Sequence, residues 1–161
     1  MSYISKRTLC SIGVGILLLI FYVIYALGAA SPAMDDLKSW AVAILIYIVV
    51  CIAAGIVVQI VFHIVFAIGI TVKEKGIDDK KVERIIKSSM VEDERDKLIS
   101  LKSSHIGYSC AGFGLVAGLV ALAVGISTVV VLHIVAGTFA LGSIIEGCVS
   151  IYLNERGVQN G

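Results

Sequence analysis

Apolar residues in this chain come in four long blocks, separated by short polar breaks and one long polar stretch. A helix needs about 20 mainly apolar residues to cross a bilayer, and each block reaches that length. The second block exceeds what a hydrocarbon core of about 30 Å requires, so we expect its helix to tilt or to extend beyond the membrane. The pattern predicts transmembrane helices at about residues 9–29, 40–72, 106–126 and 129–153.

The long polar stretch, residues 73–105, carries helix signals of its own. Asp78 and Asp79 are suitable helix caps, and Ser89 with Glu92 has the spacing of a capping box. We expect a cytoplasmic helical hairpin here, with its second arm continuing into the third span. The chain is therefore predicted to be a single all-α integral membrane domain with a helical cytoplasmic linker between spans two and three.

Composition agrees with this prediction. The 161 residues are 58% hydrophobic and only 16% charged, and the mean hydropathy is +1.00. Soluble domains contain nearer 25% charged residues. Between the last two blocks, Ser127 and Thr128 leave room for only a tight turn, so spans three and four are expected to form an antiparallel hairpin.

The distribution of lysine and arginine predicts the orientation. Lys6 and Arg7 precede the first block, most of the other basic residues lie in 73–105, and Arg156 follows the last block. Because basic residues favour the cytoplasmic side, we expect both termini and the linker in the cytoplasm, in a multi-pass protein of the cell inner membrane. The first block is longer than the roughly 7–15 apolar residues of a signal peptide, so we expect it to be a retained helix.

Residues 94–102 read Glu-Arg-Asp-Lys-Leu-Ile-Ser-Leu-Lys. This segment resembles one in a group of small prokaryotic four-helix membrane proteins, in which an Asp-Glu-Arg-Asp-x-Leu-Ile sequence links one pair of membrane helices to the next. The resemblance covers about residues 75–125 in pattern. It implies the same architecture and brings no activity with it, because no function is assigned to the group.

Ionisable residues inside apolar blocks are candidates for function, because they are costly in hydrocarbon and face the interior of a bundle. His63 lies about 15 Å along its helix from the cytoplasmic end and Glu146 about 13 Å, so the two reach similar depth. They could form a pair or share a proton. Alternatively, Glu146 is protonated or bonds a neighbouring helix as structural glue. Gln59 and His133 complete the set of candidate intramembrane polar residues.

Small and polar residues recur at every third or fourth position in three of the blocks. Helices in lipid associate through close backbone contact and interhelical hydrogen bonds, so these rows predict tight packing and a homo-oligomer. Span one is bulkier and is expected to be peripheral. The packing positions are predicted to include Gly55, Gly114, Gly118, Ala140 and Gly147.

Aromatic residues in the outer half of the spans allow two interpretations. Tyr22, Tyr25, Tyr47 and His133 could form a small hydrogen-bonded cluster or belong to an interfacial aromatic belt. Trp40, at the start of the second span, is a suitable interfacial anchor.

Catalytic and cofactor-binding motifs are absent from the sequence. It has no phosphate-binding glycine loop, no His-Glu-x-x-His, no nucleophile elbow and no basic nucleic-acid surface. Without CxxC spacing, the cysteines are expected to be small hydrophobic residues rather than metal ligands. We therefore expect no cofactor, no metal, no nucleic-acid partner and no enzyme activity. The cysteines are Cys10, Cys51, Cys110 and Cys148.

Two hypotheses for function remain open. In the first, the chain is a non-enzymatic membrane scaffold or regulator that engages a cytoplasmic protein through Glu94, Arg95, Asp96 and Lys102 and self-associates through its small-residue faces. Interspersed acids keep the polar stretch close to neutral, so we do not expect it to bind lipid headgroups. In the alternative, the chain is a small proton-coupled transporter or channel that uses the intramembrane polar residues described above.

Overall fold

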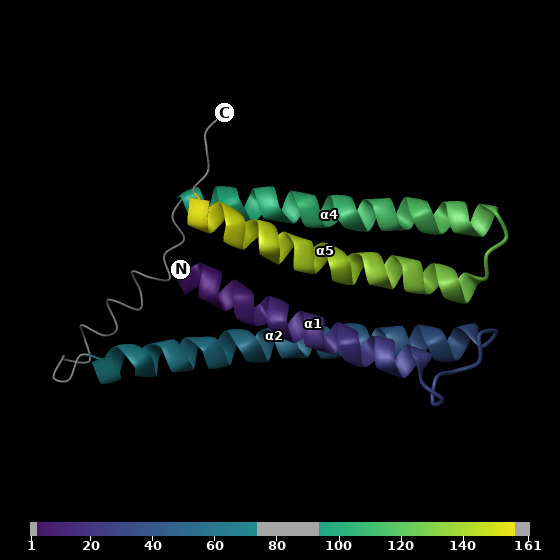
Figure 1. Cartoon of the computed structure of the whole chain (residues 1–161), viewed down its shortest axis with the longest axis horizontal. Helices are drawn as coiled ribbons and strands as arrows, with labels where there is room; N and C mark the ends of the chain where they lie inside the picture. Colours follow the sequence, from purple (N-terminus) through teal and green to yellow (C-terminus); the bar gives the residue numbers. More distant parts are fainter. Residues whose placement is uncertain (1–2, 74–93, 157–161) are drawn as a thin grey trace.

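The computed structural model describes residues 3–73 and 94–156. Within these ranges the chain forms four helices and no strand, and each helix is long and apolar enough to cross a membrane. The predicted all-α class with four long apolar helices is confirmed. The larger part of the predicted helical linker lies outside the described residues. The helices are α1 Tyr3–Leu27, α2 Leu37–Lys73, α4 Glu94–Ala123 and α5 Thr128–Arg156 (Figure 1).

Helix boundaries follow local capping chemistry. Asp36 begins α2 as its cap, because its Oδ1 accepts a hydrogen bond of 3.1 Å from the backbone N–H of Ser39. At the end of α4, Gly125 takes the left-handed conformation with φ +83°. The N–H groups of Gly125 and Ile126 then bond back to carbonyls in the last turn of α4, as in a Schellman motif. This turn leads straight into α5 and confirms the predicted antiparallel hairpin.

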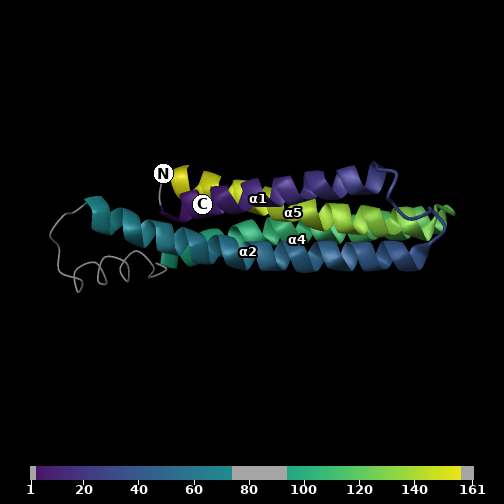
Figure 2. The same ribbon diagram turned by 90° about the horizontal axis from the view of Figure 1, so that it is seen from below.

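The helices pack in the spatial order α4, α5, α1, α2 (Figures 1 and 2). The contact between α4 and α5 is the most extensive, α1 lies against both α5 and α2, and α2 meets α5 over a shorter stretch. We call the end of the bundle where α1 begins and α5 ends the terminal end, and the opposite end the turn end. Span one, which was predicted to be peripheral, contacts both α5 and α2, but no residue in its most apolar stretch is buried. Bulky α1 contacts α5 at a small residue, because a Cβ added at Gly147 would lie 2.7 Å from Cγ1 of Ile12.

Small residues line the contact between α4 and α5. A Cβ added at Gly114 would overlap the side chain of Thr138, and one added at Gly118 would lie 3.2 Å from Cγ2 of Val135. These glycines therefore hold two helices of the same chain close together. The buried residues of α4 recur at three- and four-residue spacing, namely Ile99, Ser103, Gly107, Ala111, Gly114, Gly118 and Ala121.

Aromatic side chains form a cluster at the turn end, between α1, α2 and α5. Trp40 lies edge-on to His133, with ring centroids 4.5 Å apart, and Tyr22 lies 4.7 Å from Tyr47. Trp40 is only 1% exposed, and its indole N–H donates a 3.1 Å hydrogen bond to the carbonyl of Ala33. The prediction that Trp40 is an interfacial anchor is therefore wrong. Its polar atom is satisfied within the protein, so the ring packs inward.

Candidate functional site

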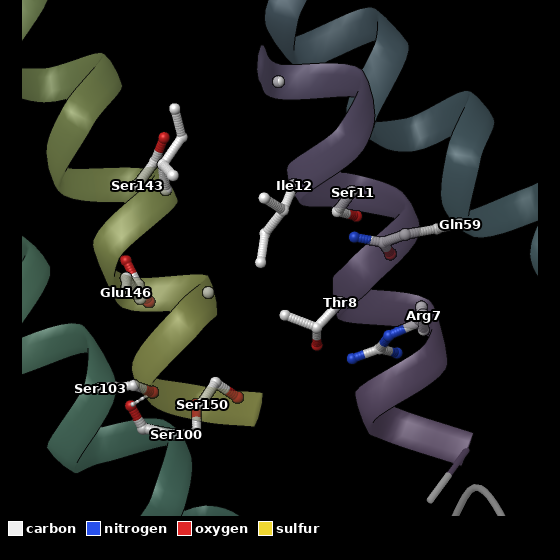
Figure 3. Close-up of a pocket in the computed structure, with 13 residues that line it drawn as sticks. Arg7, Thr8, Ser11, Ile12, Gln59, Ser100, Ser103, Ser143, Glu146 and Ser150 are labelled. Carbon is white, nitrogen blue, oxygen red and sulfur yellow. Dashed lines mark hydrogen bonds between the residues drawn. The ribbon is translucent and has the colours of Figure 1, made fainter. Parts of the chain in front are cut away.

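A polar pocket lies toward the terminal end of the bundle, with a volume of about 300 Å³. All four helices contribute to its wall (Figure 3). Two side chains in the wall are ionisable, Arg7 of α1 and Glu146 of α5, and Figure 3 shows them on opposite sides of the pocket. The remaining polar residues are Thr8 and Ser11 of α1, Gln59 of α2, Ser100 and Ser103 of α4, and Ser143 and Ser150 of α5.

Serine hydroxyls of the pocket bond to their own helices. The Oγ of Ser103, a residue only 2% exposed, donates to the carbonyl of Ile99 at 2.8 Å. Ser143 donates to the carbonyl of Ala140 at the same distance. A hydroxyl that donates in this way keeps its oxygen lone pairs as acceptors. These two serines are therefore short polar groups with satisfied donors.

Glu146 sits at the contact between α5 and α4, beside the pocket. Its Oε1 accepts a 2.6 Å hydrogen bond from Oγ of Ser104. A Cβ added at Gly107 would lie 2.7 Å from Oε2, so the carboxyl group occupies space that only glycine leaves open. The carboxyl is thus fixed by one hydrogen bond and by close packing on α4.

The structure brings some of the predicted polar residues together and separates others. Gln59 and Glu146 line the same pocket, whereas His63, one turn further along α2, is not among its lining residues. His133 belongs to the aromatic cluster, where its Nδ1 lies 2.7 Å from the carbonyl of Val129. Because a carbonyl can only accept, that nitrogen carries the proton.

Arg7 is the site residue that the sequence did not reveal. As a residue ahead of the first apolar block, it served only to predict orientation. A signal was nevertheless present, because Ser11 lies four residues after Arg7 and Gly15 four residues after Ser11, and both line the same pocket. Polar and small residues at that spacing share one face of a helix.

An apolar cavity of about 710 Å³ adjoins the polar pocket and continues between α1, α2 and α5 toward the turn end. Gly55 and Ala140, two of the predicted packing positions, line this cavity. No described atom lies within 4 Å of a Cβ added at Gly55. Gly55 therefore leaves space, unlike Gly114 and Gly118, which make close contacts. The two cavities share Ser11, Gly15, Ser143 and Ile144.

The charged start of α4 is tied to the end of α5. Arg95 donates a hydrogen bond of 3.2 Å to the backbone carbonyl of Asn154, one of the last carbonyls of α5, which lack partners within their own helix. Glu94 and Lys102 are exposed and Asp96 is half-buried. Of the four residues predicted to meet a partner, Arg95 thus has an internal structural role.

Among the described residues, no group of three or more His, Cys, Asp or Glu side chains is placed to hold a metal ion. The cysteines in this part of the chain are all free. Comparisons of the chain with known protein families, curated proteins and solved structures find no match. The resemblance noted for residues 94–102 stays a prediction.

Proposed function

We propose that the chain is a multi-pass membrane protein of the cell inner membrane with both termini in the cytoplasm. Large apolar side chains lie exposed on all four helices, among them Ile24 and Val65, each 62% exposed, Phe113, 77% exposed, and Phe139, 58% exposed. Monomeric soluble proteins rarely expose continuous apolar surface on this scale, whereas lipid covers it. The basic residues at the terminal end favour the cytoplasm for that end.

We further propose that the membrane bundle binds a small polar solute in the pocket and couples binding to protonation of Glu146. The observation behind this is the position of Glu146, an ionisable group fixed between helices at the wall of a cavity. Charged groups at such depth are costly, and they characteristically mark ion, proton or substrate pathways. Arg7 and Gln59 supply donors for an anionic or polar solute.

The proposed intramembrane site contains a different set of residues from the one that the sequence suggested. The sequence suggested a pair of His63 with Glu146, whereas the pocket joins Glu146 with Gln59 and Arg7. Removing the Gln59 amide should therefore reduce proton flux through the protein, while His63→Ala should leave this flux largely intact.

Proton flux in proteoliposomes loaded with a pH-sensitive dye tests the proposal. We expect an imposed membrane potential to drive flux in the wild-type protein, and Glu146→Gln to reduce this flux to background. Glu94→Gln is the matched control, because it makes the same change at an exposed position outside the pocket. Undiminished flux in Glu146→Gln would remove Glu146 from the mechanism, and a silent wild-type protein with intact helices would refute proton coupling.

The scaffold function is a second candidate, supported by the exposed charges at the start of α4. Glu94 and Lys102 are exposed, and Arg95 donates a hydrogen bond to α5. Charge reversal of Glu94 and Lys102 should abolish capture of a cytoplasmic partner without unfolding the bundle. Unchanged capture would exclude this surface. Gly114 and Gly147 already contact helices of their own chain, so a homo-oligomer would use a different face.

A further inference from the structure

The two cavities adjoin each other and share part of their lining, and the polarity of the lining changes from one to the other along the bundle. The terminal part is lined by Arg7, Glu146 and a set of hydroxyls, and the remainder is lined mainly by aliphatic side chains of α1, α2 and α5. Ser11 and Gly15 on α1, with Ser143 on α5, belong to both parts. A ligand that fills both cavities therefore needs a polar end and an apolar end.

The apolar part has the dimensions of a lipid chain. Along α2 it extends from Val58 to Ile44, which is about 21 Å at 1.5 Å per residue and exceeds half of a hydrocarbon core of about 30 Å. Its volume of about 710 Å³ is within the range of small-molecule sites. Helices in lipid are held by packing contacts, and the lining of an empty cavity forfeits those contacts. The space therefore favours an apolar occupant.

The polar part carries both signs of charge. The guanidinium of Arg7 is suited to a phosphate, and the carboxyl group of Glu146 stands on the opposite side of the pocket (Figure 3). A purely anionic headgroup would satisfy Arg7 and be repelled by an ionised Glu146. A zwitterionic head can place its phosphate toward Arg7 and its ammonium toward Glu146, while the hydroxyls accept further hydrogen bonds.

We propose that the two adjoining cavities together bind one amphiphile molecule with a compact zwitterionic head, of the phosphoethanolamine class. Its head lies between Arg7 and Glu146 and its chain between α1, α2 and α5. The proposal rests on the solute-binding site proposed above and identifies the solute as an amphiphile. The chain would run from the terminal end toward Tyr47, which lines the far part of the cavity.

Quenching of Trp40 fluorescence tests this proposal, because Trp40 is the only tryptophan in the chain. It lies one helical turn from Ile44, which lines the cavity, and is itself 1% exposed. The protein is placed in phosphatidylcholine nanodiscs with a small fraction of phosphatidylethanolamine that carries brominated chains. Brominated phosphatidylcholine at the same fraction measures quenching by bulk lipid. We expect the phosphatidylethanolamine probe to quench at several-fold lower mole fraction.

Two pairs of variants separate the site from the bulk lipid. Gly55→Leu fills the cavity and should abolish the difference between the probes, while Gly112→Leu, on the outer face of α4, should preserve it. In both cases no described atom lies within 4 Å of an added Cβ. Arg7→Gln should abolish the headgroup preference, and Lys6→Gln, which removes the same charge from an exposed neighbour, should not.

The outcomes distinguish this proposal from the one on which it rests. The amphiphile site is overturned if both probes quench Trp40 equally, or if Gly55→Leu still shows stronger quenching by the phosphatidylethanolamine probe. Either result would count against this site even if proton flux depends on Glu146. Preferential quenching by the phosphatidylethanolamine probe, without any proton flux, supports the amphiphile site and refutes proton coupling. A change of oligomeric state in Gly55→Leu with quenching unchanged would show that a second copy of the chain fills the cavity, and would also overturn the proposal.

Discussion

Replacing Gly114 with alanine would place a methyl group where the side chain of Thr138 already lies. The overlap involves Oγ1, Cβ and Cγ2 of Thr138, so rotation about one bond cannot clear it, and α4 must move away from α5. Overpacking costs about 1–3 kcal/mol. Because three atoms overlap, we expect a cost at the upper end of that range. Alanine recovers about 1 kcal/mol over glycine within a helix. We therefore expect a net loss of about 2 kcal/mol in the free energy of unfolding.

Two other glycines of α4 provide an internal scale for this experiment. Gly112→Ala meets no described atom within 4 Å and should stabilise the protein by up to about 1 kcal/mol. Gly118→Ala brings its methyl group to 3.2 Å from a methyl of Val135 and should be close to neutral. The expected order of stability is thus Gly112→Ala, then Gly118→Ala, then Gly114→Ala.

Reversible unfolding in mixed micelles, followed by the loss of helical circular dichroism, measures this order. The double variant Gly114→Ala with Thr138→Ala removes Oγ1 and Cγ2 of Thr138 but keeps its Cβ. It should recover part of the lost stability, with a coupling free energy above about 0.5 kcal/mol. If Gly114→Ala were as stable as Gly112→Ala, or if the double variant were merely the sum of its parts, α4 and α5 would not pack as described.

Three further predictions concern hydrogen bonds at the helix ends. Ser39, through its hydroxyl and then its backbone N–H, holds the pKa of Asp36 below its usual 3.8. The ionised cap stabilises α2 above that pH, and this contribution should be lost as the pH falls through the lowered pKa. Thermal melts at a series of pH values should show this loss in the wild-type protein but not in Asp36→Asn. Arg95→Ala removes the bond to Asn154, and amide exchange should quicken at the end of α5 by up to about tenfold. Trp40→Phe leaves a loop carbonyl without its donor and should cost about 1 kcal/mol in calorimetry.

The number and type of helices could be predicted because apolar block length is a local property of the sequence. The order in which the helices pack could not. Span one was expected to be peripheral because its residues are bulky, yet Ile12 packs against Gly147 of α5. A bulky face and a small face make a good contact together, so the position of α1 depends on which face of α5 it meets. That information is not contained in either segment alone.

The candidate site was predicted in part for a similar reason. Distance along a helix follows from helical rise, and Glu146 lies within α5, away from both of its ends. Which residues meet at that depth depends on the rotation of each helix about its axis. A difference of one turn along α2 separates Gln59, which lines the pocket, from His63, which is not among the lining residues.

Small residues in this bundle have two different effects on packing, and their spacing in the sequence cannot distinguish the two. At Gly114 the missing side chain lets two helices meet, and at Gly55 it leaves a space. The first arrangement brings α4 and α5 into close contact within the chain. The second leaves the α1–α2–α5 contact short of packing partners, and lipid chains are the apolar material that surrounds a membrane bundle. Among the described residues, α2 has the least contact with the other helices. Its position therefore depends most on what fills the cavity that it borders.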